Sequence, residues 1–174
     1  MATQTLTPIR AVRRRGGGAV TIQYFPEAAS QSFKKGEAVY LTSGTLAEFT
    51  ASVDDGTQRF LGFAAQDASG TTGAACGVWV ADDDLVFEGN IYHGTEASAV
   101  TAQSDLLSLL PLKQLTAQGA GMVAIDKEDT ASQIDCARII GFSNRPGEAV
   151  GDTYGFVQFI IEASARQIAQ ADLS

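Results

Sequence analysis

The side chains that could carry out chemistry in this sequence are few and stand far apart. His93 is the only histidine, so any Ser-His-Asp or Cys-His arrangement would have to use it. It follows Tyr92 and precedes Gly94, and nothing in the spacing ties it to a particular serine or cysteine. We therefore interpret His93 as a turn residue and expect no catalytic residues and no enzymatic activity.

The remaining reactive or ligating side chains give no site either. Cys76 and Cys136 are too far apart for the CxxC pattern of zinc and redox sites, so we expect two buried, free thiols. Asp82–Asp84 lacks the alternate spacing of a calcium-binding loop and is interpreted as a solvated acidic turn. Gly16–Gly18 is not followed by the GK[ST] of a phosphate-binding loop. The sequence thus predicts no cofactor and no metal.

The charge is unevenly distributed along the chain. Residues 1–35 hold six of the 12 basic side chains but only one of the 20 acidic ones, although the net charge is −8. An acidic body should repel nucleic acid and anionic membranes, so neither is expected as a partner. Arg13, Arg14 and Arg15 have no aromatic neighbours for base stacking, and a salt-sensitive contact with an acidic protein is favoured instead. We find no signal peptide and no membrane-spanning run, which favours a protein made in a cytoplasm without secretion.

Short apolar runs separated by Gly, Asn and Asp predict many short β-strands. The fold class expected is all-β, with a barrel-like or sandwich-like body and at most one or two short helices. One short helix is expected over Gln103–Leu110, and Trp79 is expected in the core. The strands are expected near residues 21–25, 38–42, 46–49, 59–65, 75–80, 85–87, 91–92, 122–126, 137–142 and 156–161.

Glycine positions add local expectations to this pattern. Ser43 and Gly44 between two short strands predict a tight hairpin. Gly62 inside an apolar strand predicts a bulge or a close approach of two backbones. Gly151 and Gly155 are expected to adopt positive φ angles in a turn. The strand at 156–161 is expected in the middle of its sheet.

Composition divides the chain into three parts. Residues 1–32 are predicted as an extended basic N-terminal arm, residues 33–162 as the β-rich body, and residues 163–174 as a C-terminal tail or short helix. Residues 1–19 are polar and glycine-rich, so on their own they should be flexible, with Gly16–Gly18 as a hinge.

Four segments together resemble the capsid decoration, or cement, proteins of tailed bacteriophages. They are FKKGEAVYLTSGTL, FLGFAAQDASG, VWVADDDLVFEGNIYHG and VGDTYGFVQFII, and the resemblance covers roughly residues 33–161. It implies a structural, non-enzymatic protein of the virion, assembled in the host cytoplasm and located on the capsid exterior. Such proteins bind the major capsid protein of the expanded head, often as homotrimers at three-fold positions, and stabilise contacts between its subunits.

On this basis the N-terminal arm is expected to contact the capsid. A β-barrel module of the virion for adhesion or carbohydrate binding is the alternative, and a hydrolase using His93 is a third hypothesis. Charge contacts with acidic capsid subunits are expected from Arg10, Arg13, Arg14 and Arg15. Apolar anchoring or strand addition is expected from Ile9, Val12, Val20, Ile22, Tyr24 and Phe25.

Overall fold

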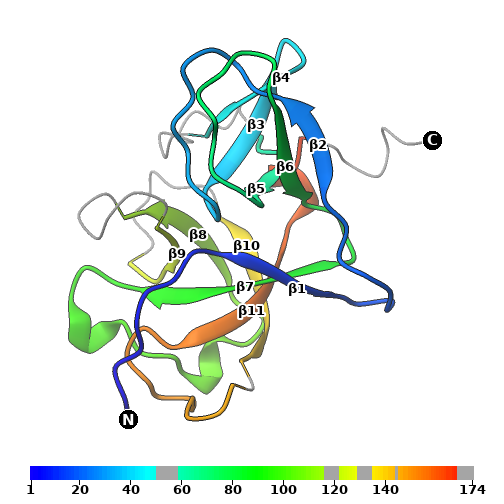
Figure 1. Ribbon diagram of the computed structural model, residues 1–174. Coiled ribbons are helices and arrows are strands. Elements are labelled where there is room, and N and C mark those ends of the chain that lie inside the picture. Colours follow the sequence, from blue (N-terminus) through cyan, green and yellow to red (C-terminus); the bar gives the residue numbers. More distant parts are fainter. Residues whose placement is uncertain (50–58, 116–121, 129–134, 144, 168–174) are drawn as a thin grey trace.

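The computed structural model describes residues 1–49, 59–115, 122–128, 135–143 and 145–167 (Figure 1). Over these residues the chain forms two β-sheets, and its helices are short 3-10 turns, so the expected all-β class is confirmed. No helix in the described part of the chain is long and apolar enough to cross a bilayer.

The larger sheet closes on itself. Its six strands lie in the order β1-β7-β11-β10-β8-β9, and β9 pairs in parallel with the end of β7, through Ile91 and Tyr92. β1 pairs with the first half of the same edge of β7, and β11 lies between β7 and β10, in the middle as expected. The strands are β1 (Arg10–Arg14), β7 (Leu85–Tyr92), β8 (Leu109–Gln114), β9 (Val123–Asp126), β10 (Asp135–Phe142) and β11 (Phe156–Ile161).

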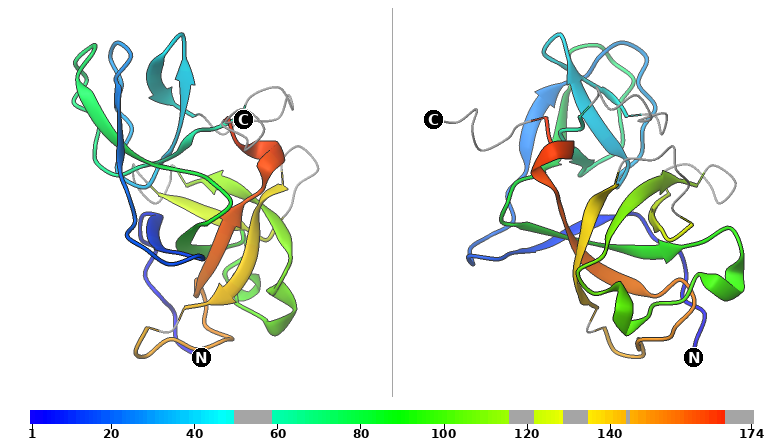
Figure 2. Two further views of the ribbon diagram at one scale, coloured as in Figure 1. Left: turned by 90° about the vertical axis from the view of Figure 1, so that its right-hand side faces the viewer. Right: turned by 180° about the vertical axis from the view of Figure 1, so that it is seen from behind.

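The smaller sheet lies at the other end of the molecule (Figures 1 and 2). Its order is β2-β6-β5-β3-β4, and an isolated bridge from Glu27 to Leu46 brings the end of β2 back to β4. The hairpin expected at Ser43 and Gly44 is confirmed, with φ angles of 49° and 79°, because tight hairpins need positive φ at both positions. The strands are β2 (Gln23–Pro26), β3 (Ala38–Thr42), β4 (Thr45–Glu48), β5 (Gly62–Ala64) and β6 (Ala75–Val80).

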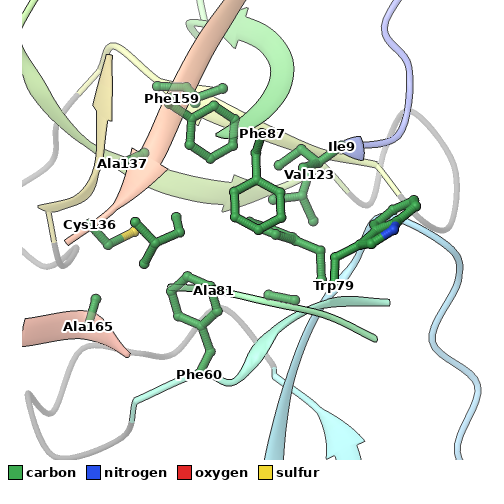
Figure 3. Close-up of a cluster of buried hydrophobic side chains, with 14 of the residues drawn as sticks. Ile9, Phe60, Trp79, Ala81, Phe87, Val123, Cys136, Ala137, Phe159 and Ala165 are labelled. Carbon is green, nitrogen blue, oxygen red and sulfur yellow. The ribbon is translucent and has the colours of Figure 1, made fainter. Parts of the chain in front are cut away.

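A single aromatic core joins the two sheets. Phe63 of β5 lies with its ring centroid 4.8 Å from that of Phe87 on β7 and 6.2 Å from that of Phe159 on β11. Phe60 continues the row into the smaller sheet, 5.6 Å from Phe63. Figure 3 shows Phe60, Phe87 and Phe159 within this cluster, together with Trp79, which is buried as expected. A second, smaller cluster fills the five-stranded sheet itself.

Two glycines allow the close packing on which this core depends. A Cβ at Gly62 would collide with the carbonyl oxygen of Trp79, so the close backbone approach predicted there is confirmed. A Cβ at Gly89 on β7 would lie 3.0 Å from Cγ1 of Ile9. Glycine at that position therefore leaves room for an N-terminal side chain inside the barrel.

The N-terminal segment is part of the folded body, in contrast to the flexible arm expected for residues 1–19. Ile9 is fully buried in the shared core, and β1 pairs along β7. The buried Asn90 side chain accepts the backbone N–H of Thr7 (2.9 Å) and donates to the carbonyls of Thr5 (3.2 Å) and Tyr154 (2.6 Å). Burial of one large apolar side chain and backbone pairing outweigh the polar composition of the segment.

The helix expected over Gln103–Leu110 is wrong. Only Gln103–Asp105 forms a 3-10 turn, Leu107 has a φ of 68°, and β8 begins at Leu109. The Leu107 N–H donates to the carbonyl of Ile139 at 2.9 Å, so pairing with β10 replaces a helical bond. Pro111 is tolerated in β8 because the register with β10 shifts beside it.

We expect Ile9→Ala to lower the free energy of unfolding by about 2–5 kcal/mol, because it empties a fully buried site. Ile22→Ala removes the same atoms from a side chain that is 43% exposed and should cost less than about 0.5 kcal/mol. Urea unfolding of both variants makes the comparison. Equal costs would show that the N-terminal segment is not part of the core in solution.

Candidate interaction surface

The N-terminal segment runs along an edge of both sheets. β1 is the terminal strand of the six-stranded order, and β2, at the strand expected near residues 21–25, is the terminal strand of the five-stranded order. Ile22 is 43% exposed and Tyr24 is 64% exposed.

Of the ten residues expected to contact a capsid, five are exposed: Arg10, Arg13, Arg15, Ile22 and Tyr24. Four are partly buried: Val12, Arg14, Val20 and Phe25. Ile9 belongs to the core, so its expected role as a partner anchor is replaced by a structural one.

The arginines of β1 already have partners within the chain. Arg10 pairs with Glu88 at 2.8 Å, and Arg13 donates to Oε1 of Gln158 at 3.1 Å. The hydrogen bond from Arg13 to the neutral Gln158 is exposed to water, whereas the Glu88 partner of Arg10 is buried. A guanidinium carries five N–H donors, so these contacts leave donors for a second protein.

Asp82 fixes the turn between β6 and β7 and holds β1 against it. Its Oδ1 accepts the backbone N–H groups of Asp84 (2.9 Å) and Leu85 (2.6 Å). Its Oδ2 accepts both terminal nitrogens of Arg14, at 3.0 and 2.7 Å. One carboxylate thus stabilises the turn and orients the N-terminal strand.

The other two carboxylates of this acidic turn are also paired. Asp84 accepts the backbone N–H of Gly16, and Asp83 forms an ion pair with the buried Arg166 from the C-terminal part of the chain. The side chains of Asp82–Asp84 remain 41%, 56% and 37% exposed in chain order, so the solvated turn expected there is confirmed, and ion pairs are added to it. Basic side chains from both ends of the chain converge on it, which the local sequence could not reveal.

A pocket of about 400 Å³ lies beside β1, between Arg10 and Arg145. Glu88 on β7 is 4% exposed at its side chain, and its Oε1 accepts from both guanidiniums. Arg145 also stacks on the ring of Phe156, with Cζ 4.0 Å from the ring centroid. Sequence reasoning missed Glu88 and Arg145, because 57 residues separate them and no local pattern links them.

A second charged cluster lies where β8 meets β9. Lys113 is 3.4 Å from the buried Asp126 and 3.0 Å from Glu128. The hydrogen bond from Lys113 lowers the pKa of the Glu128 carboxyl.

His93 Nδ1 accepts the N–H of Thr95 at 2.9 Å, the local contact of a turn residue. Over the residues with assigned positions, no group of three or more His, Cys, Asp or Glu side chains is arranged to hold a metal ion.

Both cysteines are buried and free, as expected from the sequence. Burial raises the pKa of the Cys76 thiol to about 11 and that of Cys136 to about 12. Thiols with such values carry almost no thiolate near neutral pH and are poor nucleophiles.

Asp152 holds the start of the chain to the turn before β11. It accepts the backbone N–H groups of Ala2 (2.7 Å) and Ala149 (3.0 Å) and the side-chain amide of Gln4 (2.8 Å). These hydrogen bonds, that from Ala2 above all, lower the pKa of the Asp152 carboxyl. The ionised carboxylate therefore fixes the path that leads to Ile9 and β1.

Comparison with known protein families finds no family model that matches this sequence, and no curated protein matches it either. The proposed function therefore rests on the surface described above and on the resemblance of four sequence segments to phage decoration proteins.

We expect Asp82→Ala to lower the free energy of unfolding by about 1 kcal/mol, since it removes the acceptor of two backbone N–H groups and of Arg14. Amide hydrogen exchange in β1 should accelerate in this variant. Glu96→Ala, which removes an exposed acidic side chain elsewhere, is the matched control and should change neither quantity. Equal effects in the two variants would contradict the role given to Asp82.

The lowered pKa of Asp152 also predicts a pH dependence. Because the folded-state pKa of Asp152 lies below the ordinary value of an aspartate carboxyl, about 3.9, its contribution to stability is present above that pH and is lost as pH falls through the folded value. The stability difference between the natural protein and Asp152→Asn should therefore shrink from about pH 5 to about pH 2. Urea unfolding at several pH values measures it, and a difference independent of pH would contradict this role.

Proposed function

We propose that this protein is a non-enzymatic capsid decoration, or cement, protein that binds the exterior of an expanded phage head. The four segments that carry the resemblance contribute strands to both sheets. They correspond to the β3–β4 hairpin, to β5 with the loop after it, to β6 and β7, and to β11.

The observation that carries this proposal is that β1 and β2, which follow one another along the chain, are each the terminal strand of their sheet. An edge strand offers backbone donors and acceptors to a strand from another protein. Here that edge also presents Arg10, Arg13 and Arg15 and the exposed apolar groups of Ile22 and Tyr24. We infer that it binds the major capsid protein, with the arginines facing acidic side chains of the shell.

Each of these contacts is weak alone, so we also propose self-association into a homotrimer. Several identical edges held in one particle engage the shell together, and avidity then raises the overall affinity without new contacts. The excess of acidic side chains in the rest of the chain repels nucleic acid and anionic membranes, which favours a protein partner in the virion.

One observation favours the alternative of a carbohydrate-binding or adhesion module. Tyr24 is 64% exposed, and an aromatic face on a surface can stack against a sugar. Trp79, by contrast, is buried and cannot serve such a site.

The direct experiment is co-sedimentation of the purified protein with expanded heads that lack decoration protein. We expect saturable binding at a fixed ratio to the capsid subunit, and weaker binding as salt rises, because charge contacts are screened over about 8 Å at physiological ionic strength. The double variant Arg13→Gln, Arg15→Gln should bind roughly fivefold or more weakly, since each exposed pair contributes up to about 1 kcal/mol.

The matched control is Arg59→Gln with Lys35→Gln, which removes the same charge from exposed side chains outside β1 and β2. It should bind as the natural protein does. Absence of binding to expanded heads would refute the proposed function and leave the adhesion module, tested by Tyr24→Ala on a glycan array, as the better hypothesis. Salt-independent binding would refute the contribution of the arginines.

A further inference from the structure

We propose that the pocket between Arg10 and Arg145 receives the carboxylate of an Asp or Glu side chain of the capsid subunit. This inference rests on the proposed function, since it names the group that one part of the N-terminal edge would recognise. The pocket is lined by Arg10, Ala11, Val12, Glu88, Ser143 and Arg145.

The guanidiniums of the pocket keep N–H donors free for a ligand. Those of Arg10 and Arg145 share the carboxylate of Glu88, and Glu148 also lies beside Arg145, so these four side chains together are neutral. Both guanidiniums are reachable from solvent, with side chains 51% and 29% exposed, whereas Glu88 is buried beneath them. Each guanidinium has more N–H groups than its contacts within the chain use, and two parallel N–H groups match the two oxygens of an incoming carboxylate.

Arg145 is held in place before any ligand binds. Its Cζ lies over the ring of Phe156, 4.0 Å from the centroid, and Oε1 of Glu148 lies 3.7 Å from Nη1. Its buried Nε has no hydrogen-bond partner among the described residues. A guanidinium fixed in this way loses little conformational entropy on binding and presents a planar fork that matches a carboxylate.

The remaining lining residues suit a side chain better than a free ion. The hydroxyl of Ser143 accepts the backbone N–H of Arg145 at 3.3 Å, and its own hydrogen can be donated to a ligand oxygen. Ala11 and Val12 belong to the edge strand β1 and line the same pocket. The methylene groups of an acidic side chain can pack against them while its carboxylate reaches the arginines.

The pocket can be tested without a virus by titrating the isotopically labelled protein with N-acetylglutamate at constant ionic strength. We expect saturable chemical-shift changes at the backbone amides of Ala11, Val12 and Ser143. N-acetylglutamine, which has the same shape without the charge, should produce no such changes. Arg145→Gln should weaken N-acetylglutamate binding at least tenfold, and Arg59→Gln, which removes the same charge outside the pocket, should leave it unchanged.

Arg145→Lys keeps the charge but loses the planar fork, so its affinity should lie between those of the natural protein and Arg145→Gln. Amide-shift dispersion of each variant establishes that it is folded. Equal responses to the two probes, or unchanged binding by both Arg145 variants, would overturn the proposal.

Head binding separates this inference from the proposed function. We expect folded Arg145→Gln to bind expanded heads more weakly than Arg59→Gln does. If it binds heads as the natural protein does, the pocket is not the docking point, although the proposed function stands. If the natural protein binds the carboxylate probe but not the heads, the proposed function fails and so does the assignment of the carboxylate to a capsid subunit.

Discussion

The contact of Phe63 with Phe87 and Phe159 is the interaction on which the rest of the structure depends. It joins two small sheets through one shared hydrophobic core. Together the sheets bury more apolar surface than either would bury alone. The edge-to-face arrangement of Phe63 against both partners adds a directional preference to the burial of apolar area. Once the two sheets are fixed relative to each other, the N-terminal segment can pack into one and then run on to the other.

The N-terminal segment combines strong internal anchoring with weak surface contacts. Ile9 and the buried Asn90 hold the segment to the barrel, because burial and satisfied buried hydrogen bonds dominate its energetics. The ion pair of Arg14 with Asp82 contributes less, because the Asp82 side chain is 41% exposed and water screens the pair. The segment is therefore positioned by its apolar and amide groups, and its arginines remain available to a partner without loss of the fold.

The sequence predicted most of the strands, though not β1 or β8, and several turns, because their causes are local. Alternating apolar runs and the Ser43–Gly44 hairpin depend on neighbouring residues, whereas glycine at position 62 is required by the Trp79 carbonyl on the adjacent strand. The helix predicted at Gln103–Leu110 failed because pairing with β10, a distant segment, decided the outcome. Positive φ was expected at Gly155, but the structure gives it to Tyr154, while Gly155 is required because a Cβ there would press on Thr101.

The candidate surface was predictable only in part, for the same reason: the pairing of Glu88 with Arg145 exists only once the chain is folded. The two edge strands also have a consequence for the free protein. Unpaired strand edges promote association of identical copies. Arg10 and Arg13 place positive charge along β1, and Pro26 ends β2 with a residue that cannot donate to a neighbouring strand. The same residues that mark these edges therefore also oppose their pairing with the edges of other copies.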